Sequence, residues 1–152
     1  MSLSQRLTEL GIELPAVAAP VAAYVPAVVH AGLVYTSGQL PFTAGQLPAT
    51  GKVGAEVSAE DANEYARTCA LNALAAAADA AGGVDRIGGV LRLGGFVAST
   101  PDFTGQPGVI NGASLVLGEI FGDAGRHARA AVGVPVLPLD SPVEVEVTFI
   151  LA

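Results

Sequence analysis

The chain has 152 residues, a length typical of one domain, and carries a net charge of −7 with a single lysine. Its few cations form no basic run, which argues against sequence-independent binding to nucleic acid. Charged residues are only 14% and hydrophobic residues 51%, so we expect part of the apolar surface to be buried against other copies of the chain.

Several classes of protein are disfavoured by single features. One cysteine, Cys69, excludes an intrachain disulfide, and two distant histidines give no zinc-type cluster, so we expect neither metal nor cofactor. The N-terminus lacks the apolar core of a signal peptide. Five prolines interrupt the uncharged stretch 14–51, which argues against a membrane span. We therefore expect a cytoplasmic protein without membrane contacts.

The first part of the chain predicts a helix and a strand pair. Leucines at helical spacing favour a short amphipathic helix over residues 2–11, ended by Gly11, within an N-terminal extension 1–17. Residues 15–27 are rich in proline and are predicted to be irregular. The segment 28–40 predicts two strands with a turn at Ala31-Gly32.

The second part predicts two helices and three strands. Ser58 starts a helix with Asp61 at a near capping-box position, and Gly82-Gly83 ends it. A strand over 87–99, a helix over about 108–121 and two strands, 128–134 and 142–150, follow. The order is that of one α+β domain, 1–152, with both long helices on one face of a mixed sheet.

The last strand has two different sides. Its valines and Phe149 are predicted to face the helices, which leaves Glu144, Glu146 and Thr148 on the other side. We expect the segment with Arg129 to be the neighbouring strand. If a partner subunit buries this side, the glutamates need a cation, and Arg129 is the natural candidate.

Other motifs give weak signals. Residues 45–53 miss the phosphate-loop pattern by one residue and by the absence of Ser or Thr. Ser37 has no activating base nearby in sequence. His127 is interpreted as a surface or capping residue, and Cys69 as a small buried hydrophobe.

Five segments in order resemble the RidA/YjgF family of reactive-intermediate deaminases, older labels of which include endoribonuclease L-PSP and translation-inhibitor protein. They are PVAAYVPAV, LVYTSGQLP, VINGAS, HARAAVGVPVLP and VEVEV, and the resemblance spans about residues 18–151. It implies a chorismate-mutase-like fold and a homotrimer with a ligand site at each subunit interface. It also implies hydrolysis of small 2-imino or enamine acids to ammonia and a 2-oxo acid.

The resemblance assigns roles to particular residues. Arg129 is expected to hold the substrate carboxylate, and Glu144 to activate water. The expected substrate-binding residues are Tyr24, Ser37, Gly38, Asn111 and Ala131. Glu144 is expected to stay ionised next to Arg129 unless desolvation dominates.

Some positions depart from the usual family pattern. Ala131 replaces the cysteine of well-known members, Gly112 suggests a differently shaped pocket, and Arg126 and His127 are additions close to Arg129. This indicates a divergent branch. The leading hypothesis is an enamine/imine deaminase without nucleic-acid partners; the alternatives are a non-catalytic trimeric sensor of carboxylates, a structural Arg129–Glu144 pair, and a ribonuclease as in the old label.

Overall fold

The computed structural model describes residues 1–17 and 23–152, so part of the proline-rich segment predicted to be irregular lies outside the described residues. The α-helices of the described part are α1 (Leu3–Leu10), α2 (Ala59–Ala81) and α3 (Gln106–Phe121). Its strands are β1 (Ala27–His30), β2 (Leu33–Thr36), β3 (Ile87–Ala98), β4 (Ala128–Val134) and β5 (Val143–Leu151). Short 3-10 turns lie at Val84–Arg86, Gly122–Gly125 and Pro138–Asp140.

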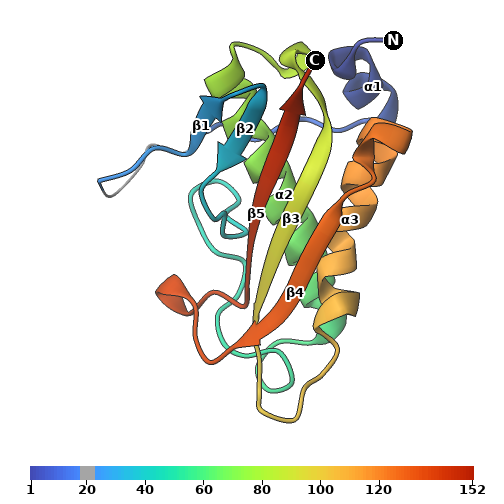
Figure 1. Ribbon diagram of the computed structural model, residues 1–152. Helices are drawn as coiled ribbons and strands as arrows, with labels where there is room; N and C mark the ends of the chain where they lie inside the picture. Colours follow the sequence, from blue (N-terminus) through green and yellow to red (C-terminus); the bar gives the residue numbers. More distant parts are fainter. Residues whose placement is uncertain (18–22) are drawn as a thin grey trace.

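The strands form a mixed sheet in the order β1-β2-β5-β3-β4. Among the strands of the described residues, β3 and β4 alone pair in parallel, and the other neighbours are antiparallel. Figure 1 shows α2 and α3 side by side behind the sheet, with α1 at the same end as both termini. The predicted α+β architecture, with both long helices on one face of a mixed sheet, is confirmed.

The helix ends follow the capping signals of the sequence. The Ser58 side chain accepts a hydrogen bond from the Asp61 N–H, and Gly82 ends α2 in the left-handed conformation. Helix α1 begins at a capping box between Ser2 and Gln5 and ends at Gly11. Helix α3 begins two residues earlier than predicted because a proline is well tolerated in a first helical turn.

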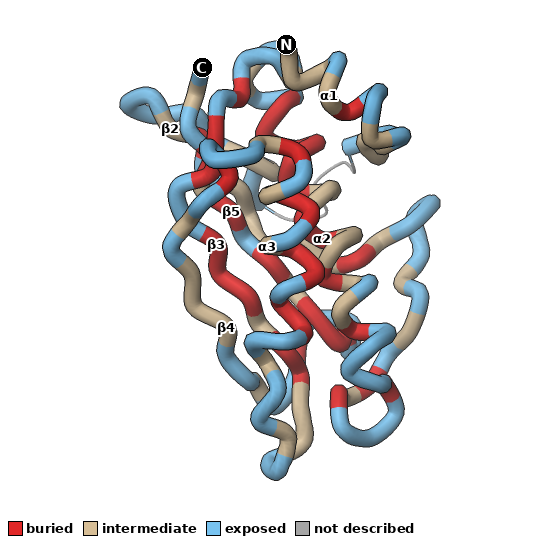
Figure 2. The backbone as a smooth tube through the Cα atoms, turned by 90° about the vertical axis from the view of Figure 1, so that its right-hand side faces the viewer, coloured by how far each residue is buried: buried red, intermediate tan, exposed pale blue. Residues whose placement is uncertain are grey.

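The predicted two-sided pattern of β5 is confirmed. Val143, Val145, Val147 and Phe149 are buried beneath the helices, at 2% exposure or less. Figure 2 shows the buried backbone concentrated where the sheet meets α2 and α3. The opposite side of the sheet, which we call the open face, has no helix against it in the described part of the chain.

The predicted neighbour of β5 is wrong. Strand β5 lies between β2 and β3, and β4 lies at the edge of the sheet, paired only with β3. The reason is that β3, α3 and β4 form a crossover unit, whose two strands run parallel and side by side. The last two strands of the chain, β4 and β5, are therefore not neighbours, and Arg129 is not on the strand next to Glu144.

Gly112 has a packing role rather than the predicted role in shaping a pocket. A Cβ at this position would lie 1.9 Å from the backbone oxygen of Asn63 on α2. The Asn63 side chain also donates a 2.8 Å hydrogen bond to the Gly108 carbonyl of α3. Gly112 therefore allows the two long helices to approach closely.

The helical extension is attached to the domain by polar contacts. Ser4 donates from its backbone N–H and its hydroxyl to Asp85, at 2.7 and 2.9 Å. Arg6 donates twice to the Glu119 carbonyl at the end of α3. No helix in the described residues has the length and apolar character needed to cross a membrane.

Candidate functional site

Arg129 lies on edge strand β4 and is held against α3. Its Cα is in register with Leu93 of β3, a buried residue beneath the helices, so the Arg129 side chain leaves the sheet on the helix-covered side. Its Nη1 donates to Ser114 Oγ at 3.0 Å and its Nη2 donates to the Pro107 carbonyl at 3.1 Å. These two bonds hold the guanidinium along one side of α3.

The Arg129 guanidinium keeps donors for a ligand. A guanidinium has five N–H groups, and two are used by Ser114 and Pro107. Within residues 1–17 and 23–152 the other three have no hydrogen-bond partner, and Arg129 forms no ion pair with a carboxylate. A fork of this kind matches a carboxylate through two parallel hydrogen bonds.

Asn111 and Ala131 belong to the same region as Arg129. Asn111 is exposed and lies one turn of α3 after Pro107 and about one turn before Ser114, the two residues that bind the guanidinium. Ala131 follows Arg129 by two residues on β4 and so faces the same side of the sheet. The structure brings these three expected site residues together at one edge.

Glu144 lies in a second region, on the open face. Its Cα is in register with Phe96 of β3. Its side chain extends over Gly38, where an added Cβ would be 2.4 Å from Glu144 Oε1. Glu144 can therefore keep this position only if residue 38 is a glycine, because any larger residue would displace the carboxylate.

Ser37 and Tyr24 complete the region around Glu144. The Ser37 hydroxyl donates to the Val25 carbonyl at 2.7 Å, and the Ser37 N–H donates to the Pro26 carbonyl at 2.8 Å. The segment that carries Tyr24 is thereby fastened beside Ser37, with 52% of Tyr24 exposed. Since the Ser37 hydroxyl proton is engaged by a carbonyl, this arrangement gives no support to a nucleophilic serine.

Burial is the main influence on the Glu144 carboxyl. It raises the pKa of Glu144 above its usual value, and the negative charge of Glu146 raises it further. Arg129 is not among the causes. Within one subunit Arg129 is not adjacent to Glu144, because the two side chains leave the sheet on opposite sides, and desolvation dominates, which is the exception stated in the sequence analysis.

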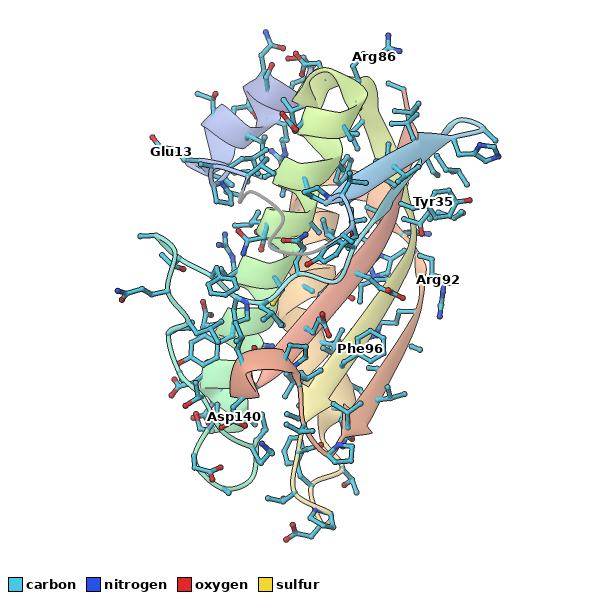
Figure 3. The ribbon with its side chains drawn as sticks, turned by 90° about the vertical axis from the view of Figure 1, so that its left-hand side faces the viewer. Glu13, Tyr35, Arg86, Arg92, Phe96 and Asp140 are labelled. Atoms are coloured by element: carbon cyan, nitrogen blue, oxygen red, sulfur yellow. The ribbon has the colours of Figure 1, made fainter. Side chains whose placement is uncertain are left out.

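The open face combines these polar groups with apolar side chains. Figure 3 shows Tyr35, Arg92 and Phe96 projecting from the side of the sheet away from the helices. The exposed apolar residues of this face are spread over the sheet: Val28, Tyr35, Val132 and Ile150, between 38 and 52% exposed. The sheet thus presents an uncovered apolar surface next to Glu144.

Ser114 is a functional candidate that the sequence analysis missed, and it contacts His127, which was noted there only as an addition close to Arg129. His127 is half-buried; its Nε2 is 2.9 Å from Ser114 Oγ, and its Nδ1 is 2.6 Å from the Gly125 carbonyl oxygen. The contact with Gly125 caps the end of the 3-10 turn Gly122–Gly125, as expected for a capping residue, and the contact with Ser114 is additional. The segment VINGAS contains Ser114, but a contact between residues 13 positions apart leaves no local sequence pattern.

The remaining motifs have structural roles. Arg126 is highly exposed and lies 3.6 Å from Asp123, so it does not compete with Arg129. Lys52, in the segment resembling a phosphate loop, pairs with Asp140. Cys69 is fully buried, as predicted, and burial raises the pKa of its thiol. In the described part of the chain, His, Cys, Asp and Glu side chains nowhere gather in threes suited to a metal ion.

Comparisons with known proteins identify relatives along almost the whole chain. Residues 4–150 match the family described as "YjgF/chorismate_mutase-like, putative endoribonuclease". Protein TCP17 of Trypanosoma cruzi is 42% identical over 145 residues, which cover 95% of this chain and 91% of that protein. Other solved structures of similar fold carry the names endoribonuclease and translation initiation inhibitor.

Two solved structures are informative. Atu1372 of Agrobacterium tumefaciens, a protein of unknown function, is 42% identical with a TM-score of 0.90, covering 99% of this chain and 92% of that one. Escherichia coli TdcF, solved with bound serine, is 25% identical with a TM-score of 0.64, covering 90% and 94%. With its mixed sheet, paired helices and family match, the chain belongs to the YjgF/RidA family, in a branch similar to TCP17 and Atu1372.

Proposed function

We propose that the protein is a homotrimeric deaminase that hydrolyses small enamine or imine acids to a 2-oxo acid and ammonia. Each site would combine the Arg129 region of one subunit with the Glu144 region of the next. One observation carries the proposal. The Arg129 guanidinium has N–H groups that are free, within the described residues, for a carboxylate, and Glu144 is a desolvated carboxylate, but within one chain the two lie on opposite faces of the sheet and cannot form one site.

The open face supports assembly through a second copy of the chain. Its apolar side chains would be buried by a partner, which agrees with a charged content of only 14%. Such an interface would bring the edge strand β4 of one subunit toward the Glu144 region of its neighbour. Family relatives form trimers of this kind according to the resemblance described above.

The Arg129 fork would bind the substrate carboxylate. Its three N–H groups without a partner in the described residues allow a two-bond grip, while Ser114 and Pro107 fix the plane of the guanidinium. Asn111 lies beside this grip on α3 and offers an amide for the substrate nitrogen or carboxylate. Fixing the carboxylate places the imine carbon within reach of water.

Glu144 would act as the general base. Enamines first tautomerise to the imine; Glu144 then takes a proton from water while the water oxygen bonds to the imine carbon. The imine reacts as its protonated iminium, so addition of the water oxygen gives a neutral carbinolamine. Glu144 then returns its proton to the amine nitrogen, the C–N bond breaks and ammonia leaves, while the hydroxyl oxygen forms the C=O bond of the 2-oxo acid and releases its proton to solvent. A raised pKa makes the Glu144 carboxylate a stronger base than an ordinary glutamate, which suits a group that accepts and returns a proton.

The substrate is expected to be small. Tyr24, Ser37 and Gly38 would border the ligand next to Glu144, and the TdcF structure with bound serine supports ligands of amino-acid size in this family. An imine is already reactive toward water, so positioning and one base suffice for useful acceleration.

The test couples the purified protein to an enzyme that generates 2-aminoacrylate and follows ammonia and pyruvate release. Acceleration by the wild type that is lost in Arg129→Ala supports the deaminase. Saturable binding of a small carboxylate without acceleration would instead make the protein a binder or sensor, and would refute the catalytic part of the proposal.

The ribonuclease label has less support in this chain. His30 lies on β1 and His127 precedes β4, at opposite edges of the sheet, so one subunit offers no histidine pair for RNA cleavage. The chain also has a net charge of −7. We therefore propose a small carboxylate, rather than nucleic acid or membrane, as its partner.

A further inference from the structure

A chain of hydrogen bonds leads from the backbone of the segment before β4 to the Arg129 guanidinium. It connects the Gly125 carbonyl to His127 Nδ1 at 2.6 Å, His127 Nε2 to Ser114 Oγ at 2.9 Å, and Ser114 Oγ to Arg129 Nη1 at 3.0 Å. Gly125 is buried, and His127, Ser114 and Arg129 are half-buried. The proposed chemistry uses Arg129 and its Ser114 anchor, but it gives no role to His127 or to the Gly125 carbonyl.

The chemistry of the groups fixes the direction of each bond. A carbonyl oxygen can only accept, so His127 Nδ1 carries a proton. In the neutral imidazole Nε2 is then an acceptor, and the Ser114 hydroxyl donates to it. The lone pairs of Ser114 Oγ remain for the Nη1–H of Arg129, which can only donate.

We propose that His127, acting through Ser114, is a positioning residue for Arg129. The inference rests on the proposed function, because it concerns how the carboxylate fork is oriented. By holding the Ser114 hydrogen, His127 turns the serine lone pairs toward the guanidinium and fixes the first of its two anchors. Without His127, the Ser114 hydroxyl is free to rotate, and the Arg129 guanidinium is no longer held in one plane.

The two anchors explain why orientation matters. Arginine has several rotatable bonds, and the Pro107 carbonyl alone holds only Nη2, which leaves the guanidinium free to pivot. A two-bond grip on a carboxylate requires both N–H groups to point the same way. Loss of the Ser114 anchor is therefore expected to weaken carboxylate binding more than it weakens the fold.

Two amide variants separate the roles of the imidazole nitrogens. His127→Gln places an amide near the Nε2 position and keeps a partner for Ser114, whereas His127→Asn keeps a donor near Nδ1 for Gly125 and loses the Ser114 contact. Pyruvate, the 2-oxo acid that hydrolysis of 2-aminoacrylate would release, is the probe, and calorimetry gives its dissociation constant. We expect affinity to fall about fivefold in His127→Asn, as for one lost hydrogen bond, and to be largely retained in His127→Gln.

A double-mutant cycle identifies the route of the effect. If His127 acts through Ser114, the double variant His127→Asn with Ser114→Ala binds pyruvate no more weakly than Ser114→Ala alone. Additive losses, or pyruvate affinity unchanged in both single variants, would overturn the inference. Circular dichroism and melting curves of each variant show that the fold is kept.

Two further readouts distinguish this inference from the proposed function. Ammonia release from 2-aminoacrylate tests the function: a protein that binds pyruvate through Arg129 without releasing ammonia keeps the inference and loses the deaminase. Long-range proton–nitrogen NMR correlations at about pH 8 report the His127 tautomer in the wild type, and the chain has only two histidines. A proton on Nε2 instead of Nδ1 would sink the inference whatever the ligand.

Discussion

Arg129 and Glu144 lie on opposite faces of one sheet, on strands separated by β3. Arg129 is in register with Leu93 and Glu144 with Phe96, three residues apart on the same strand, so their side chains point to opposite sides. One chain therefore cannot place both on the same face of a small ligand, and the proposed site needs two subunits.

Mixed oligomers test this directly. Arg129→Ala and Glu144→Gln are each expected to be inactive alone. Co-expressed in equal amounts, they should regain about one quarter of the wild-type activity, since in a closed ring of identical interfaces one interface in four joins two intact groups. The 2-aminoacrylate assay on tagged, co-purified oligomers gives the measurement.

The control for the mixing experiment combines wild type with the double variant. A shared site gives about one quarter of full activity, because both subunits at an interface must be wild type, whereas a site within one chain gives about one half. No recovery in the mixture of single variants would show that the two groups act from the same chain.

Gly38→Ala is expected to reduce activity strongly while leaving the fold intact. The new Cβ would be 2.4 Å from Glu144 Oε1, the mobile end of a side chain, so the carboxylate must move away. The matched control is Gly94→Ala, whose Cβ would instead be 2.9 Å from Glu146 Oε1. Steady-state kinetics of both variants should show a lower kcat only for Gly38→Ala; equal losses would count against Glu144 as the base.

The sequence was sufficient for the elements but not for their arrangement. Local signals such as the Ser58 cap, the Gly82 stop and the alternation of β5 act over a few residues, and the structure follows them. The place of β4 depends on α3 crossing over the sheet, which no local pattern encodes. The order of β4 and β5 in the sequence therefore suggested that they pair, whereas β3 lies between them.

The same limit applies to the candidate site. The family-like segments located Arg129 and Glu144, and the structure gives each a separate environment. The contact between His127 and Ser114 was not predicted because Ser114 lies on another element and comes close only after α3 folds back along β4. The packing role of Gly112 was not predicted, because a glycine can mark either a close contact between two helices or space in a ligand pocket, and the sequence does not distinguish the two.

Glu144→Gln is expected to stabilise the protein at neutral pH even as it removes activity. The pKa of Glu144 is raised in the folded subunit by burial, so this carboxyl favours the fold while protonated and loses that contribution as the pH rises through its folded pKa. A neutral glutamine avoids the loss. The gain is at most about 1 kcal/mol, since the side chain keeps some contact with solvent.

Melting temperatures across pH give the check. The difference between Glu144→Gln and wild type should shrink as the pH falls toward 4.5, the ordinary value for this carboxyl, because the wild-type group then becomes neutral as well. A lower melting temperature for the variant at neutral pH would indicate that Glu144 serves mainly as a structural partner of a cation in the assembly.

Gly112→Ala is expected to destabilise the fold by several kcal/mol. Its Cβ would lie 1.9 Å from the Asn63 backbone oxygen, so α2 and α3 would have to separate. Gly118→Ala on the same helix meets nothing within 4 Å and should stabilise it by about 0.5–1 kcal/mol. Urea unfolding gives the change in the free energy of unfolding for each variant, which should fall for Gly112→Ala and rise for Gly118→Ala. Equal changes in the two variants would refute the close contact at Gly112.

Arg129→Lys is expected to weaken pyruvate binding at least tenfold although the charge is kept. An ammonium group cannot satisfy Ser114 and Pro107 while also presenting two parallel N–H groups to a carboxylate. Arg126→Lys provides the matched control, because Arg126 is 87% exposed and its only ion pair in the described residues is with Asp123. Calorimetry should find wild-type affinity for that control. If Arg129→Lys also bound pyruvate normally, a diffuse positive charge rather than an oriented fork would explain binding, and the assignment of Arg129 would fail.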